Sequence, residues 1–407
     1  MISSEFAPNE SREDAVLAIS LFFQPWKWRR GKETNNLKRR LKSRFFSSDS
    51  HISFFLSAPG ALYQYIKTLS FPTETEVLVS GSTPTTHLLP ILEHQLKPVY
   101  VDIHNDDFSM NMNDLEKKYS KKAKLLILRH PYGITPKDRK KILSFAKEKK
   151  LSVIEDISQG FDSELFKKKR FTTALLMSFS RTSVISSVLG GAIITRGKKN
   201  ADLMRDVEKN IPNASFWTIL QIIFYKIGSV IIKKTYKLYF GRLLHFFMKH
   251  FNLIPQTVTK KETKGQFDPL YLKVYPNICV ILLMKQLDRF NDVSSKRKRS
   301  TAFYCKKLSV ANCSDVSLSS FPLTVSNPIQ TQTKLKQQNI ILSTEQYTLQ
   351  NEQINYHRYG YVQKMCPVCE QQIPKILKLP TTVSKKDAQK LIKVLKQAQS
   401  QKNSAKK

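Results

Sequence analysis

Glycine is scarce in this chain. The 407 residues include 12 glycines, well below the usual share of about 7%. Loops that hold a phosphate on successive backbone N–H groups need glycine, because only glycine lets the backbone approach the ligand closely. The sequence therefore offers little material for a glycine-rich nucleotide loop, and function classes that depend on one are not indicated.

Acidic residues are also few. The chain has 32 Asp and Glu against 67 Lys and Arg, for a formal net charge of +35. This excess predicts attraction to nucleic acid, an anionic membrane surface or phosphorylated small molecules. Because lysine is spread throughout, a general compositional bias is the alternative explanation. No zinc-finger, RNP or helix-turn-helix pattern occurs, so we do not expect a nucleic-acid partner.

Cysteine is rare, and its five copies are typical of a reducing, intracellular compartment. The spacing of Cys366 and Cys369 resembles half of a metal site, but the sequence supplies no second pair, so we predict no metal. The first residues carry acids and lack the basic-then-apolar order of a secretory signal. We therefore expect a cytoplasmic protein.

No apolar run is long enough to predict a membrane span, which needs about 18 residues. The closest stretch is SFWTILQIIFYKIGSVII, which Gln221 and Lys226 interrupt. It belongs to an aromatic, basic segment at 213–262. We interpret this segment as a helical hairpin packed on the body or on another subunit, and the alternative is an amphipathic element on an anionic membrane at the inner face. Lys226, Ser229 and Lys233 lie off the apolar face that the helical pattern predicts. That face is formed by Phe216, Leu220, Ile223, Ile227, Val230 and Ile231.

Apolar strands alternate with amphipathic helices from Glu76 onward. EVLVSG, KPVYVDI, AKLLILRH and LSVIEDI read as strands separated by helical patterns, and ALLMSFS and GGAIITR follow as two more strands. This order predicts an α/β fold with a mostly parallel sheet covered on both faces. We expect a large domain at 1–212, the insert at 213–262 and a smaller α+β domain at 263–407 with a disordered tail.

Polar residues follow several of these strands. Because functional loops lie at the carboxyl ends of parallel strands, the turns HPYG at 130–133, SQG after Asp156 and SRTS at 180–183 should share one rim. LMKQLDRFNDVSSKRKRSTAFYCKKL, from Leu283, is predicted to be one long helix.

Several of these blocks, in this order and spacing, resemble the DegT/DnrJ/StrS sugar aminotransferases. The resemblance rests on VLVSGSTPTTHLLPILEHQLKPVYVDI, LLILRHPYG, LSVIEDISQG, SFSRTSVISSVLGGAIIT and the C-terminal CPVCEQQIPKILKLP. It implies a seven-stranded sheet of PLP fold type I with a smaller C-terminal domain, and sites shared across a homodimer. It also implies pyridoxal phosphate (PLP) as cofactor and amination of nucleotide-linked keto-sugars for surface polysaccharides or secondary metabolites.

The resemblance assigns cofactor contacts to individual residues. In IEDISQG, Asp156 stands where the family acid holds the pyridine nitrogen of PLP, and Gln159 lies beside the cofactor. Ser178 stands at the family's phosphate-binding serine. In SAPGAL, Ala58 and Gly60 belong to the phosphate-binding turn, with Pro59 at a threonine position, where it supplies neither a hydroxyl nor an N–H.

The family's Schiff-base lysine has no counterpart in this sequence. Seven residues before the Gly190–Gly191 pair, where the family has that lysine, the chain has Ser183. A serine hydroxyl cannot form an imine with an aldehyde or shuttle the proton as an amine does. The stacking aromatic is also replaced, by Pro84. A lysine from elsewhere could substitute, but Lys67, Lys97 and Lys137 read as solvated.

Two functions remain open from the sequence. One is an enzyme related to these aminotransferases with altered chemistry, in which ordinary transamination is not expected. For that enzyme His87 is a candidate base beside Ser183, and its alternative is a polar helix-face residue. The other is a non-catalytic relative that binds a ligand or regulates a partner, with an anionic membrane surface as one site of action.

Overall fold

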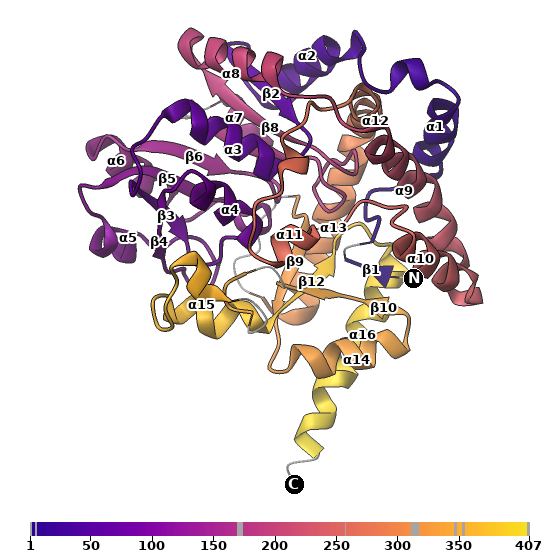
Figure 1. Cartoon of the computed structure of the whole chain (residues 1–407). Coiled ribbons are helices and arrows are strands. Elements are labelled where there is room, and N and C mark those ends of the chain that lie inside the picture. Colours follow the sequence, from indigo (N-terminus) through magenta and orange to yellow (C-terminus); the bar gives the residue numbers. More distant parts are fainter. Residues whose placement is uncertain are drawn as a thin grey trace.

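The computed structural model describes residues 2–4, 6–168, 174–256, 258–310, 317–345, 348–351 and 355–404. Its largest sheet consists of β2 (Ser50–Phe55), β3 (Glu76–Ser80), β4 (Lys97–Val101), β5 (Ala123–Arg129), β6 (Ser152–Asp156), β7 (Ala174–Ser178) and β8 (Gly191–Arg196). The order is β2-β8-β7-β6-β5-β3-β4 (Figure 1). Strands β4, β3, β5, β6 and β7 pair in parallel, and β8 is antiparallel to both neighbours. The predicted mostly parallel, seven-stranded sheet is confirmed.

Helices cover both faces of this sheet because its strands are apolar on both sides. Val77 and Val79 face a core shared with α3 and α4, whereas Leu78 faces a core shared with α5 and α6. The helices of this region are α1 (Arg12–Phe22), α2 (Glu33–Phe45), α3 (Ala58–Leu69), α4 (Thr85–Glu93), α5 (Met112–Lys118), α6 (Arg139–Glu148), α7 (Ser163–Lys168) and α8 (Lys198–Asn210), with 3-10 turns η1 (Pro25–Lys27) and η2 (Pro131–Gly133).

The C-terminal region is a smaller α+β unit. Its sheet has the order β11-β12-β9, with both pairs antiparallel, and Ile2–Ser3 of β1 pairs in parallel with β10. Residues 2–3 therefore contact this unit, although they fall in the 1–212 stretch. The elements are β9 (Ser320–Thr324), β10 (Ile340–Ile341), β11 (Ser343–Thr344), β12 (Ile376–Pro380), α14 (Pro328–Gln337), α15 (Pro367–Gln372), α16 (Lys385–Ser404), η5 (Tyr356–Tyr359) and η6 (Ile373–Lys375).

Two details of the C-terminal region differ from prediction. The long helix expected from Leu283 ends at Asp288, and a second helix begins at Phe290. The break at Arg289 lets α12 (Asn277–Asp288) contact α1 and α2 while α13 (Phe290–Leu308) runs beside α16. At the C-terminus, α16 continues to Ser404, into the stretch from 400 that was expected to be disordered, and 405–407 lie outside the described residues.

The segment at 213–262 forms the predicted helical hairpin. Helix α9 (Phe216–Thr235) and α10 (Phe240–His250) are joined by η3 (Tyr236–Leu238) and contact each other, and the short α11 (Lys260–Thr263) and η4 (Pro269–Tyr271) follow. Together with α1, α9 and α10 form one edge of the molecule (Figure 1). Phe216–Leu238 is long and apolar enough to cross a membrane, with a mean hydropathy of 1.4, but 56% of its most apolar stretch is buried within the protein.

The predicted buried face of α9 is wrong in part. Phe216 and Ile231 were expected inside, and they are 52% and 40% exposed. Lys226 was expected outside, and its side chain is fully buried. The reason is a partner distant in sequence, because Lys226 Nζ lies 2.7 Å from Glu10 Oε2 and also donates to the Ser186 carbonyl oxygen.

The Lys226–Glu10 pair should be sensitive to loss of either charge. Replacing Lys226→Met leaves the buried carboxylate of Glu10 without its hydrogen-bonded cation, and we expect the free energy of unfolding to fall by about 3–5 kcal/mol. Urea unfolding measures this loss. The matched variant Glu10→Leu with Lys226→Met removes both charges and should recover most of it. If Lys226→Met were as stable as the natural chain, Lys226 and Glu10 would not form the buried ion pair.

Candidate functional site

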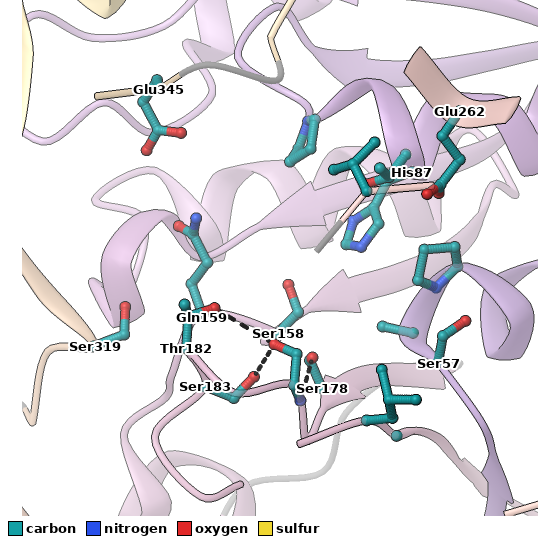
Figure 2. Close-up of a pocket in the computed structure, with 18 of the residues that line it drawn as sticks. Ser57, His87, Ser158, Gln159, Ser178, Thr182, Ser183, Glu262, Ser319 and Glu345 are labelled. Carbon is teal, nitrogen blue, oxygen red and sulfur yellow. Dashed lines mark hydrogen bonds between the residues drawn. The ribbon is translucent and has the colours of Figure 1, made fainter. Parts of the chain in front are cut away.

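A cavity of about 230 Å³ lies between the large sheet and the C-terminal sheet. It is bordered by the starts of α3 and α4, the ends of β6 and β7, and residues of β9, β11 and β12 (Figure 2). About half of its lining residues carry hydroxyl groups, among them Ser158, Ser178 and Ser183. Of the predicted rim turns, SQG and SRTS border this cavity, whereas HPYG does not line it and lies next to Gln159.

Asp156 lies just behind this cavity at the end of β6, with 1% of its surface exposed. Its Oδ2 is 3.1 Å from His87 Nδ1, and its Oδ1 accepts a hydrogen bond from the Ser158 backbone N–H. Burial acts to raise the pKa of Asp156. The charge and hydrogen bond of His87, aided by Arg129, outweigh burial and hold that pKa well below its usual range.

His87 reaches Asp156 because α4 begins directly after Pro84, and the first turn of the helix carries the imidazole into the cavity. The residue is 8% exposed, so the interpretation as a polar helix-face residue was wrong. Its Nδ1 faces the carboxylate, whereas its Nε2 has no hydrogen-bond partner among the described residues. Figure 2 shows the ring projecting into the pocket.

Ser183 lies in the turn after β7, where the lysine was expected from the resemblance. Its hydroxyl is 3.0 Å from Ser180 Oγ (Figure 2). Its carbonyl oxygen accepts a hydrogen bond from the Asn9 amide. Ser178 Oγ accepts from the Ser180 backbone N–H. The hydroxyls of this turn are thus hydrogen-bonded mainly to one another.

Gln159 fixes the neighbouring HPYG turn. Its Oε1 accepts a 2.7 Å hydrogen bond from the Tyr132 N–H. Tyr132 has φ 59°, and Gly133 has φ 97°, a conformation that favours glycine. Gly133 also lies so close to Gly160 that an added Cβ would be 3.3 Å from its backbone. Gln159 therefore positions this turn as well as lining the cavity.

The start of α3 has few N–H groups free for an anion. Ser57 Oγ caps the helix and accepts a 2.9 Å hydrogen bond from the Gly60 N–H. Pro59 has no N–H, so the first turn retains only the N–H of Ala58 for a ligand. Gly191 packs so closely that an added Cβ there would be 2.4 Å from the Ala58 nitrogen. Ala58 lines the cavity, and Gly60 lies behind it.

Lys378 is the only lysine that lines the cavity among the described residues. Its Nζ is 3.1 Å from Glu345 Oε2, and this buried carboxylate holds the amine as an ion pair. Lys67, Lys97 and Lys137 do not border the cavity. No cluster of three or more metal-ligating His, Cys, Asp or Glu side chains occurs in the described part of the chain.

Several pocket residues were missed by sequence reasoning. Arg129 is 5% exposed and donates from Nη1 to the Ser82 carbonyl oxygen, while its Nε and Nη2 have no partner among the described residues. Its position directly before HPYG, at a strand end, was the available signal. Glu345, Lys378 and Ser319 come from the C-terminal region, and only the folded chain brings them here.

The sequence model of the DegT/DnrJ/EryC1/StrS aminotransferase family matches residues 10–215. GDP-perosamine synthase of Escherichia coli O157:H7 is 28% identical over 159 residues, which are 38% of this chain and 43% of that protein. dTDP-4-amino-4,6-dideoxy-D-glucose transaminase of Escherichia coli is 30% identical over 158 residues, 38% of this chain and 42% of that protein. The chain thus matches less than half the length of these curated relatives.

Solved structures of similar fold cover nearly the whole chain. The Streptococcus pneumoniae protein Spr1654 in its PLP form has a TM-score of 0.71 at 15% identity, with 97% of this chain and 98% of that chain covered. At this identity the likeness shows the fold alone. The matched fold is the one expected from the resemblance, and the match extends over the C-terminal unit.

The pocket does not fit a covalently held PLP. A covalently held PLP needs a lysine amine, and in addition an acid for its pyridine nitrogen and donors for its phosphate. Here the one cavity lysine is held by Glu345, His87 already faces Asp156, and α3 offers a single free N–H. The cofactor contacts assigned to Asp156, Gln159, Ser178, Ala58 and Gly60 stay predictions.

The His87–Asp156 pair should make stability depend on pH. The folded pKa of Asp156 lies below its unfolded value of about 3.9, so its stabilisation is complete above that pH and is lost as pH falls through the folded pKa. In His87→Ala the buried carboxylate loses its main cation. Without His87, burial raises the pKa of that carboxyl, so it takes up a proton in acid and no longer carries a buried charge. We therefore expect a loss of about 3 kcal/mol in the free energy of unfolding at pH 7 that shrinks toward pH 3.5, measured by urea unfolding.

A second substitution controls for this effect. Adding Asp156→Asn to His87→Ala removes the carboxylate, so the remaining loss should no longer change between these two pH values. If His87→Ala lowers the free energy of unfolding by the same amount at pH 7 and at pH 3.5, the result would count against the His87–Asp156 pairing.

Proposed function

Because this chain belongs to the DegT/DnrJ/EryC1/StrS aminotransferase family, we propose that its pocket binds a nucleotide-linked sugar without transaminating it. The observation that carries this proposal is the absence of a free amine among the described residues of the cavity. Ser183 is bonded to Ser180, and Lys378 is paired with Glu345. An amine is the group that transamination with PLP requires.

Three observations support the ligand class. Both relatives named above carry names of enzymes of nucleotide-linked sugars. The hydroxyl-rich lining of the pocket can exchange hydrogen bonds with sugar hydroxyls. The partnerless Nε and Nη2 of Arg129, together with the net charge of +35, favour an anionic group such as a diphosphate.

A second candidate function rests on His87 alone. An imidazole oriented by a carboxylate through Nδ1, with Nε2 open to a pocket, is suited to move a proton at Nε2. On a bound keto-sugar, the charged His87 could donate its Nε2 proton to the carbonyl oxygen while Nδ1–H stays on Asp156. The freed Nε2 could then accept a proton from the carbon beside the carbonyl, and the reverse steps would return one to the same carbon. This would be acid–base chemistry that needs no cofactor, and it is the form of altered chemistry that the residues of this chain support.

The first test concerns PLP attachment. After incubation with PLP and borohydride, intact-mass analysis of the natural chain should show no covalently attached cofactor. Ser183→Lys alone should attach little, because His87 still faces Asp156. Ser183→Lys with His87→Ala supplies the amine and frees the acid, so it should attach several times more. Borohydride-fixed PLP on the natural chain would refute the proposal.

The second test concerns the ligand. Nucleotide sugars should raise the thermal midpoint more than the same nucleotides or free sugars do, because a ligand that binds only the folded state stabilises it. Mass spectrometry of a bound nucleotide keto-sugar in D₂O then separates the two functions. Binding without deuterium uptake supports the binding role, whereas uptake that His87→Gln abolishes supports acid–base chemistry. Absence of any nucleotide-sugar binding would rule out both.

A further inference from the structure

The helix α10 is apolar on two opposite sides. Its inner side packs on α9. Met248 of α10 lies so close to Gly228 of α9 that a Cβ added to Gly228 would clash with the Met248 sulfur. On the outer side Phe240, Leu243, Phe247 and, just past the helix end, Phe251 recur every three or four residues and share one line. These four side chains are 45% to 59% exposed. The inner contacts explain the hairpin, and the fold leaves the outer side without a partner.

The outer apolar line is part of a larger patch. Leu238 and Phe246 are 75% and 62% exposed. We call the set Leu238, Phe240, Leu243, Phe246, Phe247 and Phe251 the outer α10 face. Soluble monomers seldom expose so many adjacent large apolar side chains, and such patches mark interaction sites.

The charge around this face has one sign. The sequence contains no Asp or Glu between Glu208 and Glu262. Lys237, Arg242 and Lys249 are exposed beside the outer α10 face. Arg242 also lies over the rings of Tyr236 and Tyr239, at 5.2 and 4.6 Å from their centroids. Exposed aromatic side chains among cations, with no acidic residue from 209 to 261, match a surface of negative charge with an apolar layer beneath it.

We propose that the outer α10 face binds an anionic phospholipid surface and lies in its interface. Helix α9 cannot be the part that inserts, because its most apolar stretch is largely buried in the protein. A second copy is the less suitable occupant, since pairing this face with itself would bring cations of the same sign together. The proposal is independent of the ligand in the pocket.

Co-sedimentation of the full chain with vesicles tests this inference. We expect binding to vesicles of phosphatidylcholine and phosphatidylserine in equal amounts, and much weaker binding to phosphatidylcholine alone. Raising the salt should weaken the first interaction, because salt screens the exposed charges. Failure to bind the mixed vesicles at low salt would overturn the proposal.

Two sets of variants separate the apolar and charged contributions. Leu243→Ser with Phe247→Ser should weaken binding at least about tenfold, since each side chain loses apolar burial in the interface. Lys237→Gln with Lys249→Gln should weaken it about thirtyfold, because each cation near such a surface contributes about 1 kcal/mol. The matched control is Ile329→Ser on α14, which removes an apolar side chain that is 77% exposed away from this face and should leave binding unchanged.

The oligomeric state distinguishes the competing occupant. Light scattering on the same proteins should show the same mass for the natural chain and for Leu243→Ser with Phe247→Ser. The opposite outcome has two parts: the natural chain is an oligomer that does not bind the vesicles, and the Leu243→Ser, Phe247→Ser variant is a monomer. In that case the outer α10 face is a subunit contact and the membrane proposal is wrong. Circular dichroism confirms that each variant is folded, so a loss of binding is not a loss of structure.

Discussion

The buried ion pair between Glu10 and Lys226 joins the N-terminal segment to a helix 216 residues further along the chain. Lys226 belongs to α9, yet it also donates to the Ser186 carbonyl oxygen in the turn that borders the pocket. Next to Glu10, the Asn9 side chain donates to Ser183 and accepts from Arg297 of α13. Burying a charge away from water costs free energy unless the charge meets an opposite one. The pair therefore holds the N-terminal segment, α9 and the pocket turn in one arrangement.

The pocket illustrates the same constraint at Asp156. A carboxylate with 1% exposure requires a cation or strong donors nearby. In PLP enzymes the protonated pyridine nitrogen meets that need. Here His87 and the Ser158 N–H meet it from within the chain. Asp156 is therefore already compensated by groups of the chain itself, in a pocket that has a serine at 183 and a proline at 59.

The sequence was sufficient for the features that depend on local pattern. Alternating apolar strands and amphipathic helices predicted the parallel sheet, and the strand ends predicted which turns meet at the rim. It failed where one long-range contact overrides a pattern. Lys226 was predicted to face solvent because a helical wheel shows only the residues of one helix, and its partner Glu10 lies in another segment. His87 was ambiguous because Asp156 is 69 residues away. Lys378 and Glu345 were missed because the C-terminal unit folds back over the sheet.

The positive charges of the 213–262 segment lie in two different environments. Lys226 and Lys233 turn inward, the first to Glu10 and the second to the Ala7 carbonyl oxygen, and burial lowers the pKa of Lys233. Lys237 and Lys249 face solvent beside the exposed aromatic side chains. The stretch from 209 to 261, which has no acidic residue, thus supplies both internal cations and an outer basic rim. Met248 of α10 packs on α9, and Lys226 of α9 reaches the pocket turn, so α9 connects the exposed helix to the turn that borders the pocket.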